Sequence, residues 1–461
     1  MLKKKLHIAL STLLCCFTAA GSYAQATVTI PAVNITSQSD YTASAVPSGS
    51  SAALSVLGSI TVKSSTANFP ATTSGTSAPL ALGVVHPKVN SIGGLNLLGA
   101  ATEVQLSTLA QGIYTSVLGL GSGALTIDYR IAIAGTAWLA GTYATPLTFV
   151  NATPVSQNLS IVVPALLTLN TPVTTPTTMT VNALSAFRTG GGVSATNTFD
   201  YFSTVPTDVF LNSTSSTFSF STTQLFNSTP VVPSGKLTAL LSGAYAGPAI
   251  SLSTAAQAIS VSGSVPVVAT NKNGQSNTLS ISAADLKANF VQAGTYTLPI
   301  VYTIAKNVAA YPATLASITT SSSVQVTVAK MSELTIPAST VNFSFTTPAA
   351  YSQGLTVAMP NPITVSSTVP YGVTVKTSGN FISGANSIPA GVMIVEGTPS
   401  QTGISPVTLS TTATNLFNGS NPVIDRTINL QFRVPNTQTV NLLNKPAGTY
   451  NATVTFTIVA P

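Results

Sequence analysis

A four-residue sequence, Ala-Gly-Thr-Tyr, occurs three times in this chain and constrains the fold more than any other feature. Its glycines are Gly141, Gly294 and Gly448, so consecutive copies are 153 and 154 residues apart. Two other sequences recur in the same order relative to it: Leu-Ser-Thr, at Leu106, Leu252 and Leu409, and Ser-Thr-Val-Pro, at Ser203 and Ser367. Solenoid repeats are about 20–50 residues long, whereas about 150 residues can bury a core of their own. The repeat therefore predicts whole domains in tandem.

The residues between the markers predict strands. Apolar and polar residues alternate with a period of two in several runs, for example 324–328 and 373–375. Such alternation is typical of half-buried strands, and clusters of Gly, Pro, Asn and Ser interrupt it every ten residues or so. Residues 282–289 are the best candidate for a helical turn. We predict an all-β protein of three tandem Ig-like antiparallel β-sandwich domains in an extended array.

The domain boundaries follow from the repeat. We expect a secretory signal peptide at 1–24 and β-sandwich repeats at 25–158, 159–330 and 331–461. The signal has three lysines, a short apolar run at 6–17, and small residues at Ser22 and Ala24. The connections between repeats are short, which favours a stiff rod over flexibly tethered modules. The protein is thus expected to be exported to the extracellular space or cell surface, with the periplasm or the outer-membrane surface as further possibilities.

The composition argues against catalysis and nucleic-acid binding. Removing the signal removes both cysteines and leaves 13 basic and 9 acidic residues, with charged residues only 5% of the chain. His86 is then the only histidine, and we interpret it as a loop or strand-end residue. Acid–base chemistry needs a histidine or paired carboxylates, and a metal site needs several close ligands. We therefore predict no enzyme activity, no cofactor, no metal and no nucleic-acid partner.

The Gly-Thr-Tyr sequence has a physical role in a sandwich. Glycine permits the turn that enters a strand, and the tyrosine hydroxyl can bond back to the backbone of that turn, as in the tyrosine corner of Ig-like domains. The tail at 446–458 resembles the last strand of chaperone–usher pilins, spore-coat-U-like proteins and WxL domains. The resemblance implies a bacterial surface β-sandwich protein. The pilins' cysteine pair and the WxL tryptophan motif are absent, which leaves the family open.

The third repeat differs from the other two by one strand. After the Gly-Thr-Tyr strand, the first two repeats continue into apolar runs at 159–163 and 324–328, whereas the third ends at Pro461. If those runs belong to the preceding sandwich, the third sandwich has an open edge with Ala452, Val454, Phe456 and Ile458 pointing inward and the threonines between them outward. A neighbour could fill that edge with a strand such as 26–30. The simpler interpretation, which we favour here, assigns both runs to the following domain.

Two functions lead on this basis, ahead of an accessory, wall-associated or enzymatic role. The first is a surface structural or fibre protein, with other copies of the chain or other surface proteins as partners. The alternative is an adhesin that binds glycans, for which exposed aromatics would be needed. The candidates are Tyr41, Tyr201, Phe202, Tyr351 and Tyr371. Aromatic residues in sandwiches are more often part of the core.

Overall fold

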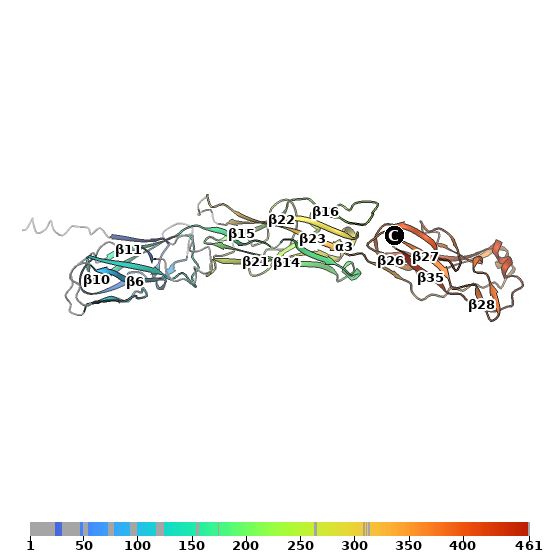
Figure 1. Ribbon diagram of the computed structural model, residues 1–461, viewed down its shortest axis with the longest axis horizontal. Coiled ribbons are helices and arrows are strands. Elements are labelled where there is room, and N and C mark those ends of the chain that lie inside the picture. Colours follow the sequence, from blue (N-terminus) through green and yellow to red (C-terminus); the bar gives the residue numbers. More distant parts are fainter. Residues whose placement is uncertain are drawn as a thin grey trace, which may run out of the picture.

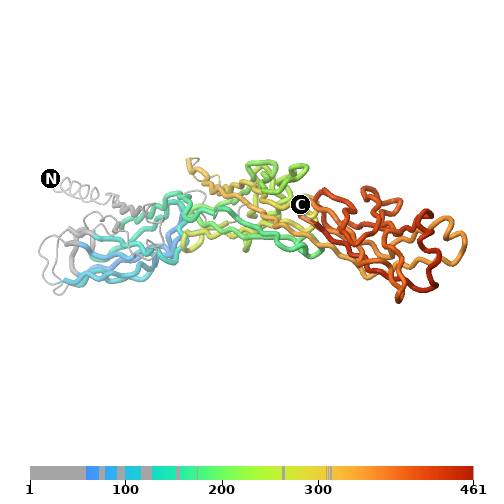
Figure 2. The backbone as a smooth tube through the Cα atoms, turned by 45° about the vertical axis from the view of Figure 1, so that its right-hand side comes forward, coloured from blue at the N-terminus to red at the C-terminus, as the bar shows by residue number. Residues whose placement is uncertain are grey.

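The computed structural model is an elongated array in which three β-sheet units follow one another end to end (Figures 1 and 2). We refer to residues 24–163, 167–328 and 332–459 as the first, second and third unit. The described residues are 24–29, 47–48, 54–71, 78–92, 99–116, 124–153, 156–173, 175–261, 265–307, 309, 311 and 314–459. The predicted signal peptide lies outside them, apart from Ala24.

The first unit is built mainly from one nine-stranded sheet. Six strands follow the order β1-β11-β10-β3-β8-β7, β9 pairs with β2, β3 and β6, and β4 and β5 form a small separate sheet. The strands are β1 (Ala24–Thr29), β2 (Pro47–Ser48), β3 (Leu54–Ser64), β4 (Asn68–Phe69), β5 (Leu80–Ala81), β6 (Val85–Ile92), β7 (Gly99–Ala101), β8 (Gln111–Ser116), β9 (Ala124–Ile131), β10 (Gly141–Thr153) and β11 (Ser156–Val163).

The second unit packs two sheets against each other. One has the order β12-β14-β21-β18-β19, and the other β13-β23-β22-β15-β20 with β16 and β17 attached. Its elements are β12 (Leu167–Thr171), β13 (Thr177–Val181), β14 (Gly192–Ser203), β15 (Thr207–Ser213), β16 (Thr217–Ser221), β17 (Val232–Pro233), β18 (Thr238–Leu241), β19 (Ile250–Ser251), β20 (Gln257–Ala258), β21 (Lys272–Ser282), α3 (Ala283–Asn289), β22 (Gly294–Lys306) and β23 (Ile318–Val328).

The third unit has smaller sheets. Their orders are β24-β26-β33, β25-β34-β30-β31, β32-β27-β35 and β28-β29. The elements are β24 (Ser332–Thr335), α4 (Pro348–Gln353), β25 (Gly354–Ala358), β26 (Ile363–Ser367), β27 (Tyr371–Thr377), β28 (Phe381–Ser383), β29 (Asn386–Ile388), β30 (Ile394–Gly397), β31 (Val407–Thr408), β32 (Thr414–Ser420), β33 (Val423–Ile428), β34 (Leu430–Pro435), the 3-10 helix η6 (Asn436–Leu442) and β35 (Val454–Val459).

The hydrophobic core is divided into three large clusters that follow the three units, with a small fourth cluster at the first joint. Alternation along the strands produces these cores. In β13, residues 177, 179 and 181 are buried and the residues between them are exposed. Two side chains cross the joints, since Phe202 belongs to the first core and Ile424 to the second. The units therefore share buried surface at both joints.

The all-β prediction is confirmed, with two corrections. The sheets are antiparallel except that β1 pairs with β11, and β13 with β23, in parallel. The boundary predicted at residue 158 is misplaced, because it cuts through β11, whose pairing with β10 continues to Val163. The predicted helical turn is α3, where the Ser282 hydroxyl caps the helix by accepting a hydrogen bond from the Asp285 amide.

Candidate functional site: the open edge of the third unit

The three Gly-Thr-Tyr turns have the same geometry. In each one the tyrosine hydroxyl donates a 2.9 Å hydrogen bond to the carbonyl four residues earlier, from Tyr143 to Leu139, Tyr296 to Gln292 and Tyr450 to Pro446. A side chain on Gly294 would lie 2.6 Å from the Ser221 carbonyl, so close packing requires glycine there. The predicted tyrosine corner is confirmed in all three units. The strand begins at the glycine itself in the first two units, as β10 and β22, whereas in the third unit β35 begins six residues after Gly448.

In the first two units this strand has neighbours on both sides. β10 lies between β3 and β11, and β22 lies between β23 on one side and β15 and β16 on the other. The runs at 159–163 and 324–328 therefore complete the sandwich that precedes them. Our favoured interpretation, which assigned them to the following domain, is wrong. The hydrogen-bonding edges of β10 and β22 hold these runs in the preceding units.

A further strand closes each of these two units. β1 lies parallel to β11, with Ala24 opposite Gln157 and Thr29 opposite Val162, and β13 lies parallel to β23 in the same way. The N-terminal segment proposed as a donor is therefore paired within its own unit. This pairing argues against the suggestion that residues 26–30 fill the third unit of another copy.

In the third unit the corresponding strand, β35, has a neighbour on one side. Its residues 454–459 pair with residues 372–377 of β27, as β22 pairs with β15. Within the described part of the chain, no strand pairs with its other edge. That edge therefore presents backbone N–H and C=O groups of the kind that bind an added strand.

Burial along β35 follows the predicted pattern. Ala452, Val454 and Ile458 are half-buried and Phe456 is 7% exposed, while Thr453, Thr455 and Thr457 are exposed. The equivalent inward residues of the second unit are all 0% exposed: Leu298, Ile300, Tyr302 and Ile304. The same positions are therefore covered where a neighbouring strand is present and partly uncovered in the third unit.

By its correspondence to β13, we assign the segment 341–345 as the second wall of this edge. It follows β24 in the chain as β13 follows β12, and its residues Val341, Phe343 and Phe345 are half-buried with exposed residues between them. All three pack against the third core, as Val454 and Ile458 do. The segment has the alternation of a strand but forms no ladder. Its counterpart β13 bonds to β23, and the third unit has no such strand among its described residues.

We define the open edge as β35 together with segment 341–345. Chemically it offers a free row of backbone hydrogen-bonding groups and two rows of apolar side chains. It suits an extended peptide with alternating apolar residues, because main-chain bonds provide affinity and the side-chain positions provide register. The sequence predicted the β35 wall, while the 341–345 wall was missed although Val341-Asn342-Phe343-Ser344-Phe345 alternates with a period of two.

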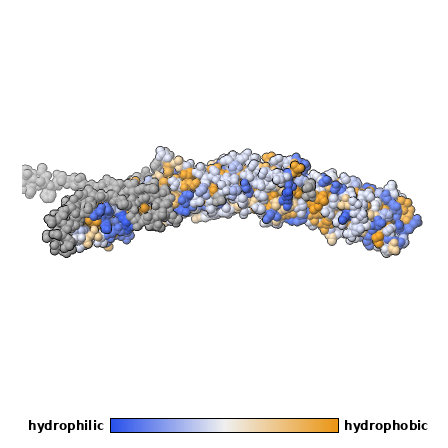
Figure 3. All heavy atoms as spheres, in the orientation of Figure 1, coloured by the Kyte–Doolittle hydropathy of each residue, from blue (hydrophilic) through white to orange (hydrophobic). Residues whose placement is uncertain are grey.

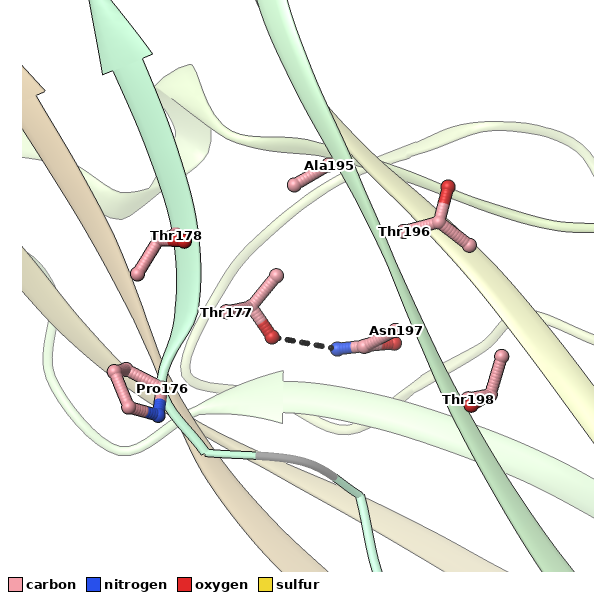
Figure 4. A pocket seen from close by; sticks show the side chains of 7 residues that line it. All are labelled: Pro176, Thr177, Thr178, Ala195, Thr196, Asn197 and Thr198. Carbon is pink, nitrogen blue, oxygen red and sulfur yellow. Dashed lines mark hydrogen bonds between the residues drawn. The ribbon is translucent and has the colours of Figure 1, made fainter.

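Other polar sites are small. A cavity of about 250 Å³ opens between β13 and β14, and Figure 4 shows Thr177 and Asn197 facing each other inside it. The Asn197 Nδ2 donates a 3.3 Å hydrogen bond to the Thr177 Oγ1. The seven lining residues carry no ionisable side chain. This cavity therefore supplies no group for acid–base chemistry.

His86 lies at the start of β6, as predicted, beside the ion pair between Glu103 and Arg130. Its Nδ1 is 3.9 Å from the Glu103 Oε1, which also lies 2.6 Å from the Arg130 Nη2. Burial, helped by the Arg130 charge, lowers the pKa of His86, and Glu103 opposes this only in part. Within the described residues, no three His, Cys, Asp or Glu side chains lie close enough to hold a metal ion.

The aromatic residues proposed for glycan binding are mostly interior. Tyr201 and Tyr371 are 0% exposed and Phe202 is 2% exposed, so these three belong to cores. Tyr351 is half-buried, and Tyr41 lies outside the described residues. The favoured interpretation of these aromatics as core residues therefore holds for the three buried ones, and the glycan-binding alternative does not.

Comparison with known proteins gives similarity at the level of solved structures. No protein-family model matches the chain, and no curated protein matches it. The chain is similar to CfaE, the adhesive subunit of the CFA/I fimbria of enterotoxigenic Escherichia coli, at 10% identity and a TM-score of 0.27, covering 68% of this chain and 100% of that one. It is also similar to the CsuC–CsuE chaperone–tip subunit complex of Acinetobacter baumannii, at 13% identity and a TM-score of 0.28, covering 62% and 99%.

A third similar structure is the CupB6 tip adhesin from Pseudomonas aeruginosa, at 10% identity and a TM-score of 0.28, covering 64% of this chain and 96% of that one. These similar structures are bacterial fimbrial and tip-adhesin proteins. At such identities and TM-scores, the functional argument depends on the geometry of the third unit. In the described residues, no helix is both long and apolar enough to span a membrane.

Proposed function

We propose that this protein is an exported, non-catalytic surface protein that occupies one end of a fibre and binds the next subunit through the open edge of its third unit. The supporting observation is the contrast between β35 and its two counterparts. β10 and β22 each carry a strand on the edge that β35 leaves free. The first two units thus show, within the same chain, what the third unit lacks.

The terminal position follows from the state of β1. A subunit inside a fibre must both accept a strand and donate one. Here β1 is already paired with β11 over six residues, so the first strand of the described chain is engaged within its own unit. We infer that the protein accepts a strand and donates none, which restricts it to one end of an assembly.

The test supplies the missing strand in the same molecule. β35 ends near the C-terminus, and in Figure 1 this end lies toward the second unit. A copy of residues 156–163 is added after Pro461 through a turn of about four residues, a usual hairpin length. We expect the third unit to unfold at a higher denaturant concentration, by several kcal/mol, because three apolar side chains become buried at roughly 1.5 kcal/mol or more each.

The matched control carries the same extension with Leu159, Ile161 and Val163 of the added copy replaced by Asn. It preserves chain length and backbone and removes the apolar row, so it should leave the stability unchanged. Hydrogen exchange of the β35 amides gives a second readout and should slow only with the apolar extension. Equal stability and exchange for the two extended proteins would show that the edge does not accept a strand.

A further inference from the structure

We propose that the far end of the third unit is one half of a joint, and that the partner which fills the open edge docks a whole β-sandwich there. This inference depends on the proposed function, since the docked sandwich arrives with the donor strand. This joint is of the same kind as the two joints inside the chain, which connect the first unit to the second and the second to the third. The evidence is that these two joints use the same hydrogen bonds in the same places.

The first joint is organised by Thr204 of the Ser-Thr-Val-Pro sequence. Its carbonyl accepts a 2.7 Å bond from the amide of Ala140, the first residue of Ala-Gly-Thr-Tyr. Its hydroxyl donates to the Pro164 carbonyl at 2.8 Å and accepts from the Leu166 amide at 2.7 Å. Both connector residues follow β11 directly. A single threonine thus holds the end of the preceding unit and the chain that leaves it.

The second joint repeats these bonds with Thr368. Its carbonyl accepts a 2.8 Å bond from the Ala293 amide, and its hydroxyl bonds the Ala329 carbonyl and the Met331 amide, each at 2.8 Å. The connector has three residues between the strands at both joints, 164–166 and 329–331. Thr204 and Thr368 are each 0% exposed. The two repeated sequences therefore recognise each other across every joint of the chain.

The far end of the third unit presents the same surface without a partner. The turn retains its geometry, since Tyr450 bonds Pro446 as Tyr296 bonds Gln292, but Ala447 is exposed whereas Ala293 is 2% exposed. Three large apolar side chains are also exposed in this region, Ile382 at 48%, Val440 at 62% and Leu443 at 52%. Figure 3 shows apolar atoms at this end of the molecule.

The direction of the missing strand leads to this end. β11 and β23 run antiparallel to their Gly-Thr-Tyr strands and finish opposite the glycine, with Val163 opposite Gly141 and Val328 opposite Gly294. A strand that occupied the same place on β35 would finish opposite Gly448 and leave the unit beside Ala447. Three connector residues would then bring its own sandwich onto the exposed surface.

The two internal strands also define the sequence of the partner. The last three inward positions are apolar in both, as Leu159, Ile161 and Val163 in β11 and as the valines at 324, 326 and 328 in β23. The inward position before them is polar, Gln157 or Ser322. The partner is therefore another β-sandwich subunit. Its free strand ends in three alternating apolar residues followed by a three-residue connector, and a buried threonine further along its sandwich holds that connector, as Thr204 and Thr368 do here.

The experiment builds this joint from parts of the protein itself. One protein is extended after Pro461 by the turn and residues 156–163, and a second by the turn and residues 156–328, which add β11, its connector and the complete second unit. Hydrogen exchange is followed by mass spectrometry at the Ala447 amide, with Ala293 as the internal standard. We expect slow exchange of β35 in both proteins. The Ala447 amide should slow to the rate of Ala293 only in the longer one.

A variant of the longer protein distinguishes formation of the joint from protection of Ala447 by the mere presence of a second sandwich nearby. Thr204→Val in the added copy removes the hydroxyl that holds the connector and leaves the backbone intact, so Ala447 exchange should return toward the rate seen with the strand alone. If β35 is protected while Ala447 exchanges equally fast in both extended proteins, the joint is overturned and the open edge stands. If β35 is unprotected in both, the proposed function fails, and the joint with it.

Discussion

At the scale of single residues, the tyrosine corner is the device that all three units share, and its surroundings differ. The rings of Tyr143 and Tyr296 are 0% exposed, and burial raises the pKa of both hydroxyls. Tyr450 makes the same hydrogen bond but is only half-buried. The tyrosine corner of the third unit is thus already formed without a neighbouring strand, but it lacks the burial that such a strand gives the corners of the first two units.

Removing one hydroxyl should therefore cost more in the second unit than in the third. Tyr296→Phe should lower the free energy of unfolding by about 1 kcal/mol, because the Gln292 carbonyl loses a buried partner. Tyr450→Phe should cost less, since water can reach the Pro446 carbonyl. Denaturant unfolding of the two variants measures the difference, and a larger loss for Tyr450→Phe would contradict it. In the strand-extended protein the cost of Tyr450→Phe should increase toward that of Tyr296→Phe.

At the scale of elements, the sequence predicted what is local and failed where distant segments must pair. Alternation located the strands and the inward face of β35, and residues 282–289 were correctly predicted as the helical turn that forms α3. The same reasoning assigned β11 and β23 to the wrong unit. The sequence of a strand does not show which other strand it pairs with. It used Ser-Thr-Val-Pro only as a marker, since the bond from Thr204 to Ala140 joins residues far apart in the chain.

The first joint also depends on a buried side chain, Asn271, that no sequence motif indicated. Asn271 is 0% exposed, accepts a bond from the Trp138 amide, and donates to the carbonyls of Trp138 and Ser203. Asn271→Ala would leave these buried backbone groups unpaired. We expect a loss on the order of 3 kcal/mol, at about 1–3 kcal/mol for each buried group left unsatisfied.

The effect of Asn271→Ala should appear in both units that meet at this joint, with increased proteolysis of the connector 164–166. The matched control is Asn170→Ala, because Asn170 is exposed on β12. Unfolding by denaturant and limited proteolysis provide the measurements. A variant as stable and protease-resistant as the control would show that Asn271 does not hold the joint.

At the scale of the whole molecule, Thr204 and Thr368 make the same hydrogen bonds at the two joints, but the joints differ in the charged side chains around them. Neutral Asn271 reinforces the first joint, whereas the second has an ion-pair cluster. Arg188 lies 2.6 Å from Glu333 and 3.1 Å from Asp425, and Lys287 lies 3.0 Å from the other oxygen of Asp425. Arg188 and Lys287 belong to the second unit and both carboxylates to the third. The stiffness of the rod should therefore depend on pH at one joint only.

The sign of this dependence follows from Asp425. Burial by itself raises its pKa, but the hydrogen bonds from Lys287, Arg188 and Ser366 outweigh burial, so the pKa lies below its ordinary value of 3.8. A carboxyl group whose pKa is lowered by folding stabilises the folded arrangement above the ordinary pKa, and this contribution is lost as the pH falls through the lowered value. The second joint should accordingly remain rigid at neutral pH and loosen in acid.

Small-angle X-ray scattering between pH 7 and about pH 2 tests this expectation, since the contribution of Asp425 is lost only below the ordinary pKa of an aspartate. We expect the extended rod at neutral pH and increased bending at the second joint in acid. Asp425→Asn should bend already at pH 7 and respond less to acid, because both ion pairs of Asp425 are gone at every pH and only the Arg188–Glu333 pair remains. A rod that keeps its scattering profile across the range, or an Asp425→Asn variant as straight as the parent at pH 7, would show that the hydrogen bonds of Thr368 suffice to hold the joint without the charges.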